Sequence, residues 1–146
     1  ELVRTYPIHS LNVIAHIRKA TVGQVSLDNT HPFVREMWGR YWTFAHNGTL
    51  DGRAFDVDVR RFRPVGTTDS EAAFCHILET LWQRFPGGCP DAATLHGALR
   101  EIADRLGAHG PFNFLLSDGE TLFARCATQL SYVVRRAPFA TAHLMD

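Results

Sequence analysis

The sequence has no excess of either charge, no long apolar run and few cysteines. Its 15 Lys and Arg residues balance its 15 Asp and Glu residues, so charge gives no reason to expect nucleic acid or an anionic membrane as a partner. No apolar run approaches the roughly 20 residues of a membrane span, and no signal peptide opens the chain. These absences favour a cytoplasmic protein that binds neither nucleic acid nor a membrane.

Cysteine and histidine are placed in ways that argue against a disulfide framework and a metal site. The histidines His16, His31 and His46 lack the i,i+4 or His-x-His spacing that would aim two imidazoles at one ion. The cysteines are odd in number, widely spaced and outside any Cys-x-x-Cys pair, which fits a reducing compartment. They are Cys75, Cys89 and Cys126.

Length and hydrophobic content place the chain in the range of one globular domain. Two helices are expected in its middle. Hydroxyls and acids at 67–71 start the first helix, and Pro86-Gly87-Gly88 ends it. The second helix starts near Asp91 and stops at 107–110. Strands are expected on both sides of the helices, which favours an α+β fold. One strand is expected at 11–17 and a second ends at Asn47-Gly48. Three more are expected at 112–116, 121–126 and 131–134.

The stretch from Trp42 to Gly52 reads as a strand that runs into a turn. Aromatic and β-branched residues suit a half-buried strand. Asn47-Gly48 is among the strongest short turn signals, because both residues tolerate a positive φ. On its own the dipeptide predicts a hairpin turn.

Three polar positions stand at the ends of these elements: Arg18 with Thr21, Asn47-Gly48, and Asp69. Each position also has a purely structural explanation. Arg18 suits a surface ion pair and Thr21 a turn hydroxyl, Asn47-Gly48 suits a hairpin, and Asp69 suits a helix N-cap. Together they suit recognition of an amino acid followed by acyl transfer. A guanidinium fork matches an α-carboxylate and an Asp carboxylate holds an α-ammonium. An Asn amide and the N–H of a following Gly can converge on one oxyanion.

Several ordered motifs resemble class II glutamine amidotransferases, and among them most of all the YafJ-type stand-alone members. The motifs recur in order along the chain, so the resemblance covers nearly all of it. They are AHIRKAT at 15–21, the run from NTHPF at 29–33 to FAHNG at 44–48, FRPVGTTDSE at 62–71, PFNFLLSDG at 111–119 and RRAPF at 135–139.

The resemblance implies a fold, a reaction and a set of roles. The fold is that of the N-terminal-nucleophile hydrolases, a four-layer αββα sandwich of antiparallel sheets, and the reaction is hydrolysis of the glutamine side-chain amide without a cofactor. Arg18 and Thr21 would bind the substrate carboxylate, Asp69 the substrate ammonium, and Asn47 with Gly48 would form the oxyanion hole. The nucleophile of the family is a cysteine at the mature N-terminus, whose own α-amine serves as base.

That cysteine is absent from this sequence, which begins with Glu1. None of the three cysteines present can carry a free α-amine. We therefore expect residues 1–146 to be the central part of a single amidotransferase domain, without the N-terminal nucleophile segment and the C-terminal end. Such a fragment would not turn over glutamine by itself.

Two other functions fit the same residues. A γ-glutamyl peptide or metabolite amidohydrolase of the same fold would make identical contacts to the γ-glutamyl group. A non-catalytic glutamine- or glutamate-binding module would keep the binding residues without turnover. In each case the partner is a small-molecule substrate or ligand, and a second copy of the chain or a synthase that takes up ammonia stays open as a protein partner.

Overall fold

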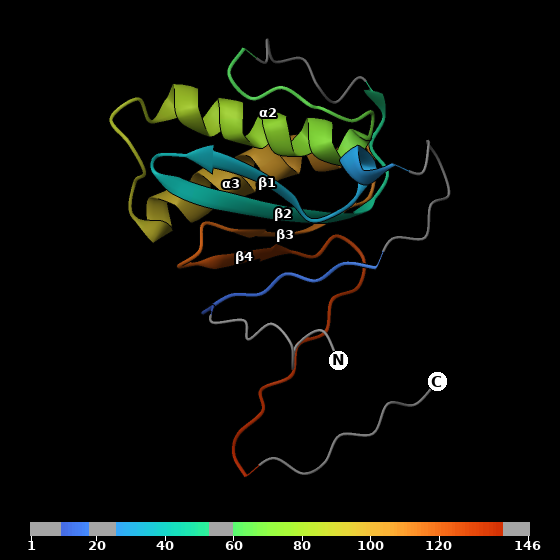
Figure 1. Ribbon diagram of the computed structural model, residues 1–146, viewed down its shortest axis with the longest axis vertical. Helices are drawn as coiled ribbons and strands as arrows, with labels where there is room; N and C mark the ends of the chain where they lie inside the picture. Colours follow the sequence, from blue (N-terminus) through green and yellow to red (C-terminus); the bar gives the residue numbers. More distant parts are fainter. Residues whose placement is uncertain (1–9, 18–25, 53–59, 139–146) are drawn as a thin grey trace.

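The structure, a computed structural model, describes residues 10–17, 26–52 and 60–138. These residues contain one antiparallel sheet with the strand order β1-β2-β3-β4, and two long helices on one of its faces (Figure 1). The α+β class is thereby confirmed, with one sheet and one helical layer in the described part of the chain. The elements are η1 (Leu27–Asn29), β1 (Phe33–Met37), β2 (Arg40–Gly48), α2 (Asp69–Arg84), α3 (Ala92–Gly107), β3 (Phe112–Ser117) and β4 (Leu122–Arg125).

Side chains alternate between the two faces of the sheet along the central strands, and this alternation decides which face the helices cover. Phe44 of β2 stacks on Phe74 of α2, with ring centroids 5.1 Å apart. Its partner in the ladder is Leu116 of β3, and both side chains are buried. Side chains of successive residues point to opposite faces. The next residue of each strand therefore points away from the helices, as Ala45 and Leu115 do.

Both predicted helices are confirmed, and local capping explains where they begin. The hydroxyl of Thr68 accepts from the N–H of Glu71 at the start of α2. The carboxylate of Asp91 accepts from the first free N–H groups of α3. These bonds satisfy donors that a helix leaves unpaired at its N-terminus. The predicted apolar stripe of α3 is buried at every position: Leu95, Ala98, Leu99, Ile102, Ala103 and Leu106.

The hairpin predicted at Asn47-Gly48 is wrong. Both residues stay in the β2–β3 ladder, where Asn47 pairs with Asn113 and Gly48 with Phe112. The tight turn lies earlier, at Trp38-Gly39, where both residues have a positive φ and join β1 to β2. A turn dipeptide is a local signal, and pairing with a strand far along the chain overrides it here.

The strand predicted at 11–17 is also wrong. The described segment forms no ladder, and the side chains of Leu11, Val13 and Ile17 are exposed. It runs along the face of the sheet opposite the helices, where the Asn12 side chain donates to the carbonyl of Gly119 (Figure 1). An apolar run becomes a strand only beside an edge that can pair with its backbone, and this segment lies across a face instead.

The strand predicted at 131–134 is wrong for the same reason. Tyr132, Val133 and Val134 are all exposed, and no described strand pairs with them. Figure 1 shows this part of the chain leading away from the sheet after β4. β-branched residues favour a strand mainly through contacts with neighbouring strands, which these residues lack among the described parts of the chain.

Candidate active site at the ends of β2 and α2

Three of the predicted site residues come together where β2 ends and α2 begins. Asn47 and Gly48 are the last two residues of β2, and Asp69 is the first residue of α2. The backbone N–H of Leu50 donates to Asp69 Oδ2 at 2.8 Å, which ties the two element ends to each other. Arg18 and Thr21 lie outside the described residues.

Asp69 is not the N-cap that its position in the sequence allowed. The cap is Thr68, which has an extended backbone and bonds the N–H of Glu71. Asp69 is therefore released from capping, and its Oδ2 binds the chain just after the Asn47-Gly48 pair. Among the described residues, Leu50 is the one that donates to this carboxylate, and it does so to Oδ2.

Gly48 lies where a side chain would not fit. Its φ is +153°, and a Cβ added there would lie 1.8 Å from the carbonyl oxygen of Pro111. The end of β2 thus approaches the start of β3 at a distance that only glycine allows. Asn47 and Gly48 are both exposed, so solvent or a small ligand reaches this backbone.

His46 is a site residue that sequence reasoning did not identify. It is buried, and its Nδ1 lies 2.9 Å from Ser70 Oγ while its Nε2 lies 3.3 Å from the carbonyl oxygen of Pro111. A carbonyl only accepts, so Nε2 carries a proton, and in the neutral ring, which the lowered pKa of His46 favours, Nδ1 accepts from the Ser70 hydroxyl. One neutral imidazole thereby joins β2, α2 and the residue before β3.

Burial lowers the pKa of His46 below its ordinary value. The bond to Pro111 and the charge of Asp69 oppose this shift, and His16 adds to it. The feature of the sequence that points to His46 is a polar residue at a position of β2 that faces the helices. In the β2–β3 ladder His46 pairs with Phe114. The neutral state suits a residue that holds the backbone in place.

Asn113 is the second residue that was missed. It faces Asn47 across the β2–β3 ladder, and its Nδ2 donates to the carbonyl oxygen of Asn47 at 3.0 Å. Its Oδ1 accepts from the N–H groups of Ala127 and Thr128 at 2.8 and 3.0 Å. The side chain therefore links the predicted oxyanion residues to the segment after β4.

A pocket of about 170 Å³ opens beside these residues. Asn47 and Asn113 line it from the sheet, His16 from the segment that crosses the open face, and Gln129 with Leu130 from the segment after β4. Phe114 and Arg125 also line it, so its surface combines amide, imidazole, guanidinium, aromatic and aliphatic groups.

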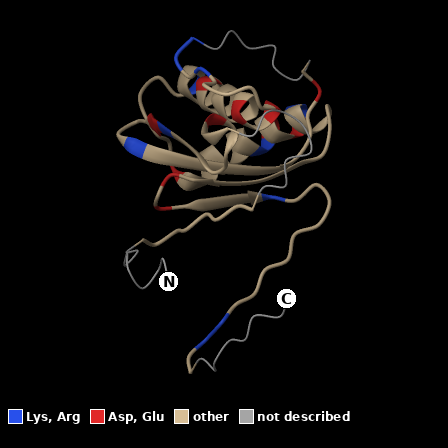
Figure 2. Ribbon diagram, turned by 45° about the vertical axis from the view of Figure 1, so that its right-hand side comes forward, with Lys and Arg blue, Asp and Glu red and all other residues tan. Residues whose placement is uncertain are grey.

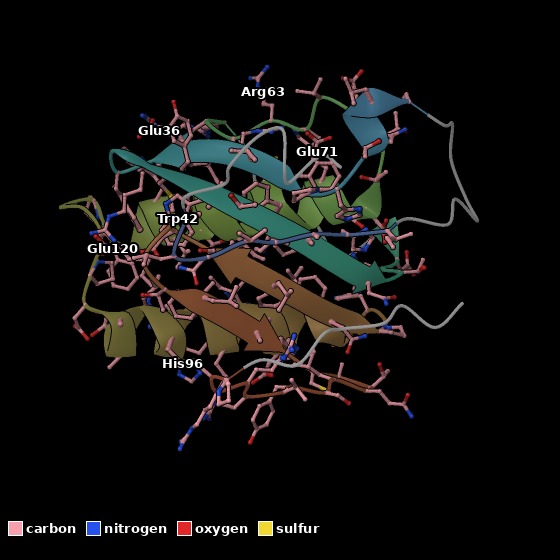
Figure 3. All side chains as sticks on the ribbon, turned by 60° about the horizontal axis from the view of Figure 1, so that its bottom comes forward. Glu36, Trp42, Arg63, Glu71, His96 and Glu120 are labelled. Atoms are coloured by element: carbon pink, nitrogen blue, oxygen red, sulfur yellow. The ribbon has the colours of Figure 1, made fainter. Side chains whose placement is uncertain are left out.

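The segment that leads into α2 is fixed by a buried carboxylate. Glu71 accepts from the N–H groups of Val65 and Gly66, at 3.0 and 2.7 Å, and also binds the guanidinium of Arg35 on β1. Figure 3 labels Glu71 at the end of the sheet near η1. The first turn of α2, and Asp69 with it, is thereby held against β1.

Two further anchors hold the same segment. Burial opposes the ionisation of Glu79, but hydrogen bonds from the N–H groups of Arg61 and Phe62, together with one from Gln83, favour it, and the pKa of Glu79 lies below its usual value. Asn29 Oδ1 accepts from the N–H of Thr67 at 2.9 Å. The backbone from Arg61 to Thr67, which leads into α2, therefore has defined partners.

The cysteines are free and none lies among the site residues. Cys75 is buried in α2, and burial raises the pKa of its thiol to about 11. Burial also raises the pKa of Cys89, while Cys126 is exposed beyond β4. Thiolate, not thiol, is the nucleophile, so Cys75 has the wrong protonation state for that role.

The described residues contain no cluster of His, Cys, Asp or Glu with the arrangement of a metal site. Within the same residues, no helix is long and apolar enough to cross a membrane. Acidic and basic residues alternate along the helices and turns, as the colours of Figure 2 show. The described groups at the site are amides, a carboxylate and an imidazole.

Comparison with known proteins gives the family. A family model described as "Glutamine amidotransferases class-II" matches residues 1–146. The chain therefore belongs to the class II glutamine amidotransferases, as its motifs predicted.

Individual relatives agree along the whole chain. It is 51% identical to "Putative glutamine amidotransferase YafJ" of Escherichia coli (strain K12) over 146 residues, which are 100% of this chain and 57% of that protein. It is 49% identical to "Putative glutamine amidotransferase" of Haemophilus influenzae, again over 100% of this chain and 49% of that protein. The chain thus spans about half the length of the curated relatives it matches.

A solved structure has the same fold. The crystal structure of a "predicted glutamine amidotransferase from Pseudomonas aeruginosa PA01" superposes with a TM-score of 0.73 and 50% sequence identity. The match covers 85% of this chain and 48% of that one. The sheet and helices described above are therefore those of a glutamine amidotransferase.

Proposed function

We propose that the complete gene product containing these residues, here called the complete protein, hydrolyses the side-chain amide of glutamine or of a related γ-glutamyl compound. The observation that carries the proposal is the bond from Leu50 N–H to Asp69 Oδ2, which gathers Asn47, Gly48 and Asp69 into one site. Membership of the class II glutamine amidotransferases supports the same chemistry.

Asn47 and Gly48 form the oxyanion hole in this proposal. Attack on the amide carbon turns its carbonyl oxygen into an oxyanion, and donors already in position stabilise that charge without rearranging. The side-chain amide of Asn47 supplies one bond and the backbone N–H of Gly48 the other. The exposure of both residues supports their access to a substrate.

Charged groups hold the ends of the amino acid. Asp69 Oδ1 accepts from the substrate ammonium while Oδ2 keeps its bond to Leu50. Arg18 binds the substrate carboxylate through its guanidinium fork, with Thr21 beside it. This arrangement selects a free α-amino acid and leaves the γ-amide at the oxyanion hole.

The nucleophile is an N-terminal cysteine that is none of the three in this chain. Its α-amine takes the thiol proton, the thiolate forms a C–S bond to the amide carbon, and the C–N bond breaks as the proton passes to the departing ammonia. Water then hydrolyses the γ-glutamyl thioester to glutamate and restores the thiol. Residues 1–146 alone are inactive in this scheme.

The test is to follow ammonia and glutamate released by the complete protein from glutamine, with γ-glutamyl peptides assayed in parallel. Equimolar release of both products from glutamine supports the proposal. The variant with Cys75, Cys89 and Cys126 all replaced by Ala should keep this activity. If products are released from γ-glutamyl peptides but not from glutamine, the substrate is a γ-glutamyl peptide. If glutamine binds but neither ammonia nor glutamate is released, hydrolysis is contradicted and a binding module is favoured.

A further inference from the structure

The side-chain amide of Asn113 has an unambiguous orientation. The N–H groups of Ala127 and Thr128 both point to one of its atoms, and the hydroxyl of Thr128 lies 3.2 Å from the same atom. Backbone N–H groups only donate, so that atom must be the oxygen. The amide NH₂ is thereby turned toward β2, where it donates to the carbonyl oxygen of Asn47 at 3.0 Å.

The carbonyl that Asn113 binds belongs to the peptide unit that ends in the N–H of Gly48. A peptide unit is planar and nearly rigid. A bond to its oxygen therefore fixes the direction of its N–H as well. The same bond polarises the unit, which makes the N–H a stronger donor because hydrogen bonds in a chain reinforce one another.

We infer that Asn113 is a positioning residue for the oxyanion hole, acting through the Asn47–Gly48 peptide; this inference rests on the proposed function. Asn113 lies directly across the ladder from Asn47, so no other β3 side chain is in register with it. The hydrogen bonds that its oxygen accepts from the segment after β4 hold the amide in the orientation in which its NH₂ group donates to Asn47. In this role Asn113 acts through the Asn47–Gly48 peptide and not on the substrate itself.

A simpler role would be a staple that attaches the segment after β4 to the sheet. The two roles use opposite ends of the amide, so substitutions can separate them. Asn113→Asp keeps an oxygen for Ala127 and Thr128 but has no N–H for Asn47. Asn113→Leu is neutral and removes both sets of bonds. Thr128→Val removes one bond on the staple side and leaves the donated bond in place.

The experiment is steady-state glutaminase kinetics of these variants in the complete protein, with an NMR measurement of the Gly48 amide resonance. We expect Asn113→Asp and Asn113→Leu each to lower kcat by about tenfold, the effect of roughly one hydrogen bond, with KM within about twofold of wild type. The Gly48 resonance should shift in both. Thr128→Val should leave kcat and that resonance unchanged.

The staple role predicts a different pattern, in which Asn113→Asp keeps the wild-type kcat. That result would overturn the inference, as would a normal kcat for the neutral Asn113→Leu, because the loss in Asn113→Asp would then come from its charge. Asn47→Ala separates this inference from the proposed function. If Asn47→Ala lowers kcat and the Asn113 variants do not, only the positioning role fails; if Asn47→Ala has no effect, the oxyanion assignment itself fails.

Discussion

Asp69 accepts the backbone N–H of Leu50 at 2.8 Å, so the first residue of α2 is bonded to the chain two residues beyond the end of β2. This contact makes one site from two elements that are separate in the sequence. It also occupies only one oxygen of the carboxylate. The same side chain can therefore hold the backbone and bind a substrate ammonium.

Asp69→Asn should separate these two uses of the carboxylate. The amide oxygen still accepts from Leu50, so the fold is kept, but the charge that binds an ammonium is lost. We expect KM for glutamine to rise about tenfold or more, since hydrogen bonds to charged groups are worth about 1.5–3 kcal/mol, with little change in Tm. The matched control is Thr68→Ala, which removes the N-cap and should cost about 1 kcal/mol of stability without changing KM. An unchanged KM in Asp69→Asn would reject the ammonium role.

Arg18→Lys should weaken capture of glutamine by the complete protein. A lysine ammonium keeps the charge but cannot reproduce the two parallel bonds of the guanidinium fork. We expect a higher KM with kcat nearly unchanged. If KM for glutamine is indifferent to this substitution, Arg18 is not the carboxylate clamp.

Gly48→Ala should damage both stability and activity. The added Cβ would lie 1.8 Å from the Pro111 carbonyl oxygen and would occupy a φ that favours glycine. The end of β2 must therefore move, and the Gly48 N–H moves with it. We expect a lower Tm together with a fall in kcat. Gly97→Ala is the control, because a Cβ there meets no atom within 4 Å on an exposed position of α3, and it should raise stability by up to about 1 kcal/mol. Equal thermal stability of the two variants would contradict the close approach at Gly48.

His46 should make the fold sensitive to acid. Its pKa is lowered in the folded state, chiefly by burial, so the unfolded chain binds the proton more readily. The stability that this group contributes is present above its unfolded pKa of about 6.5 and is lost as the pH falls through its lower folded value. We expect Tm to fall on acidification below about pH 6.5, and the fall to be shallower in His46→Gln.

His76 provides the comparison for this pH effect. Burial lowers its pKa as well, so His76→Gln should also flatten the dependence of Tm on pH. His46 touches the residues around Asn47-Gly48, through Ser70 and Pro111, whereas His76 lies further along α2. His46→Gln should therefore lower kcat and His76→Gln should not. Equal kcat values would remove His46 from the account of the site.

The helices could be predicted because their signals are local. Capping groups lie within three residues of each helix start, and the apolar stripe of α3 repeats at helical spacing, so the neighbours that decide the structure are close in the sequence. The segments at 11–17 and 131–134 have the composition of strands, but none of the described strands pairs with them. Strand formation depends on a partner elsewhere in the chain, which composition does not specify.

The residues of the candidate site also divide into those that the sequence predicts and those that it does not. Asn47, Gly48 and Asp69 were identified by their residue types and by resemblance to a family. His46 and Asn113 act through partners 24 and 66 residues away, Ser70 and the carbonyl of Asn47. A buried histidine and an asparagine on a strand have many uses, and only the register of β2 against β3 shows what these two hold.

The kinetics of Asn47→Ala test the central claim most directly. In the complete protein, removal of the side-chain donor should lower kcat for glutamine hydrolysis by about 10²–10³, with KM nearly unchanged because the bond forms only in the transition state. Tm should stay close to that of wild type, since the Asn47 side chain is exposed. A kcat equal to that of wild type would contradict the assignment of Asn47 to the oxyanion hole.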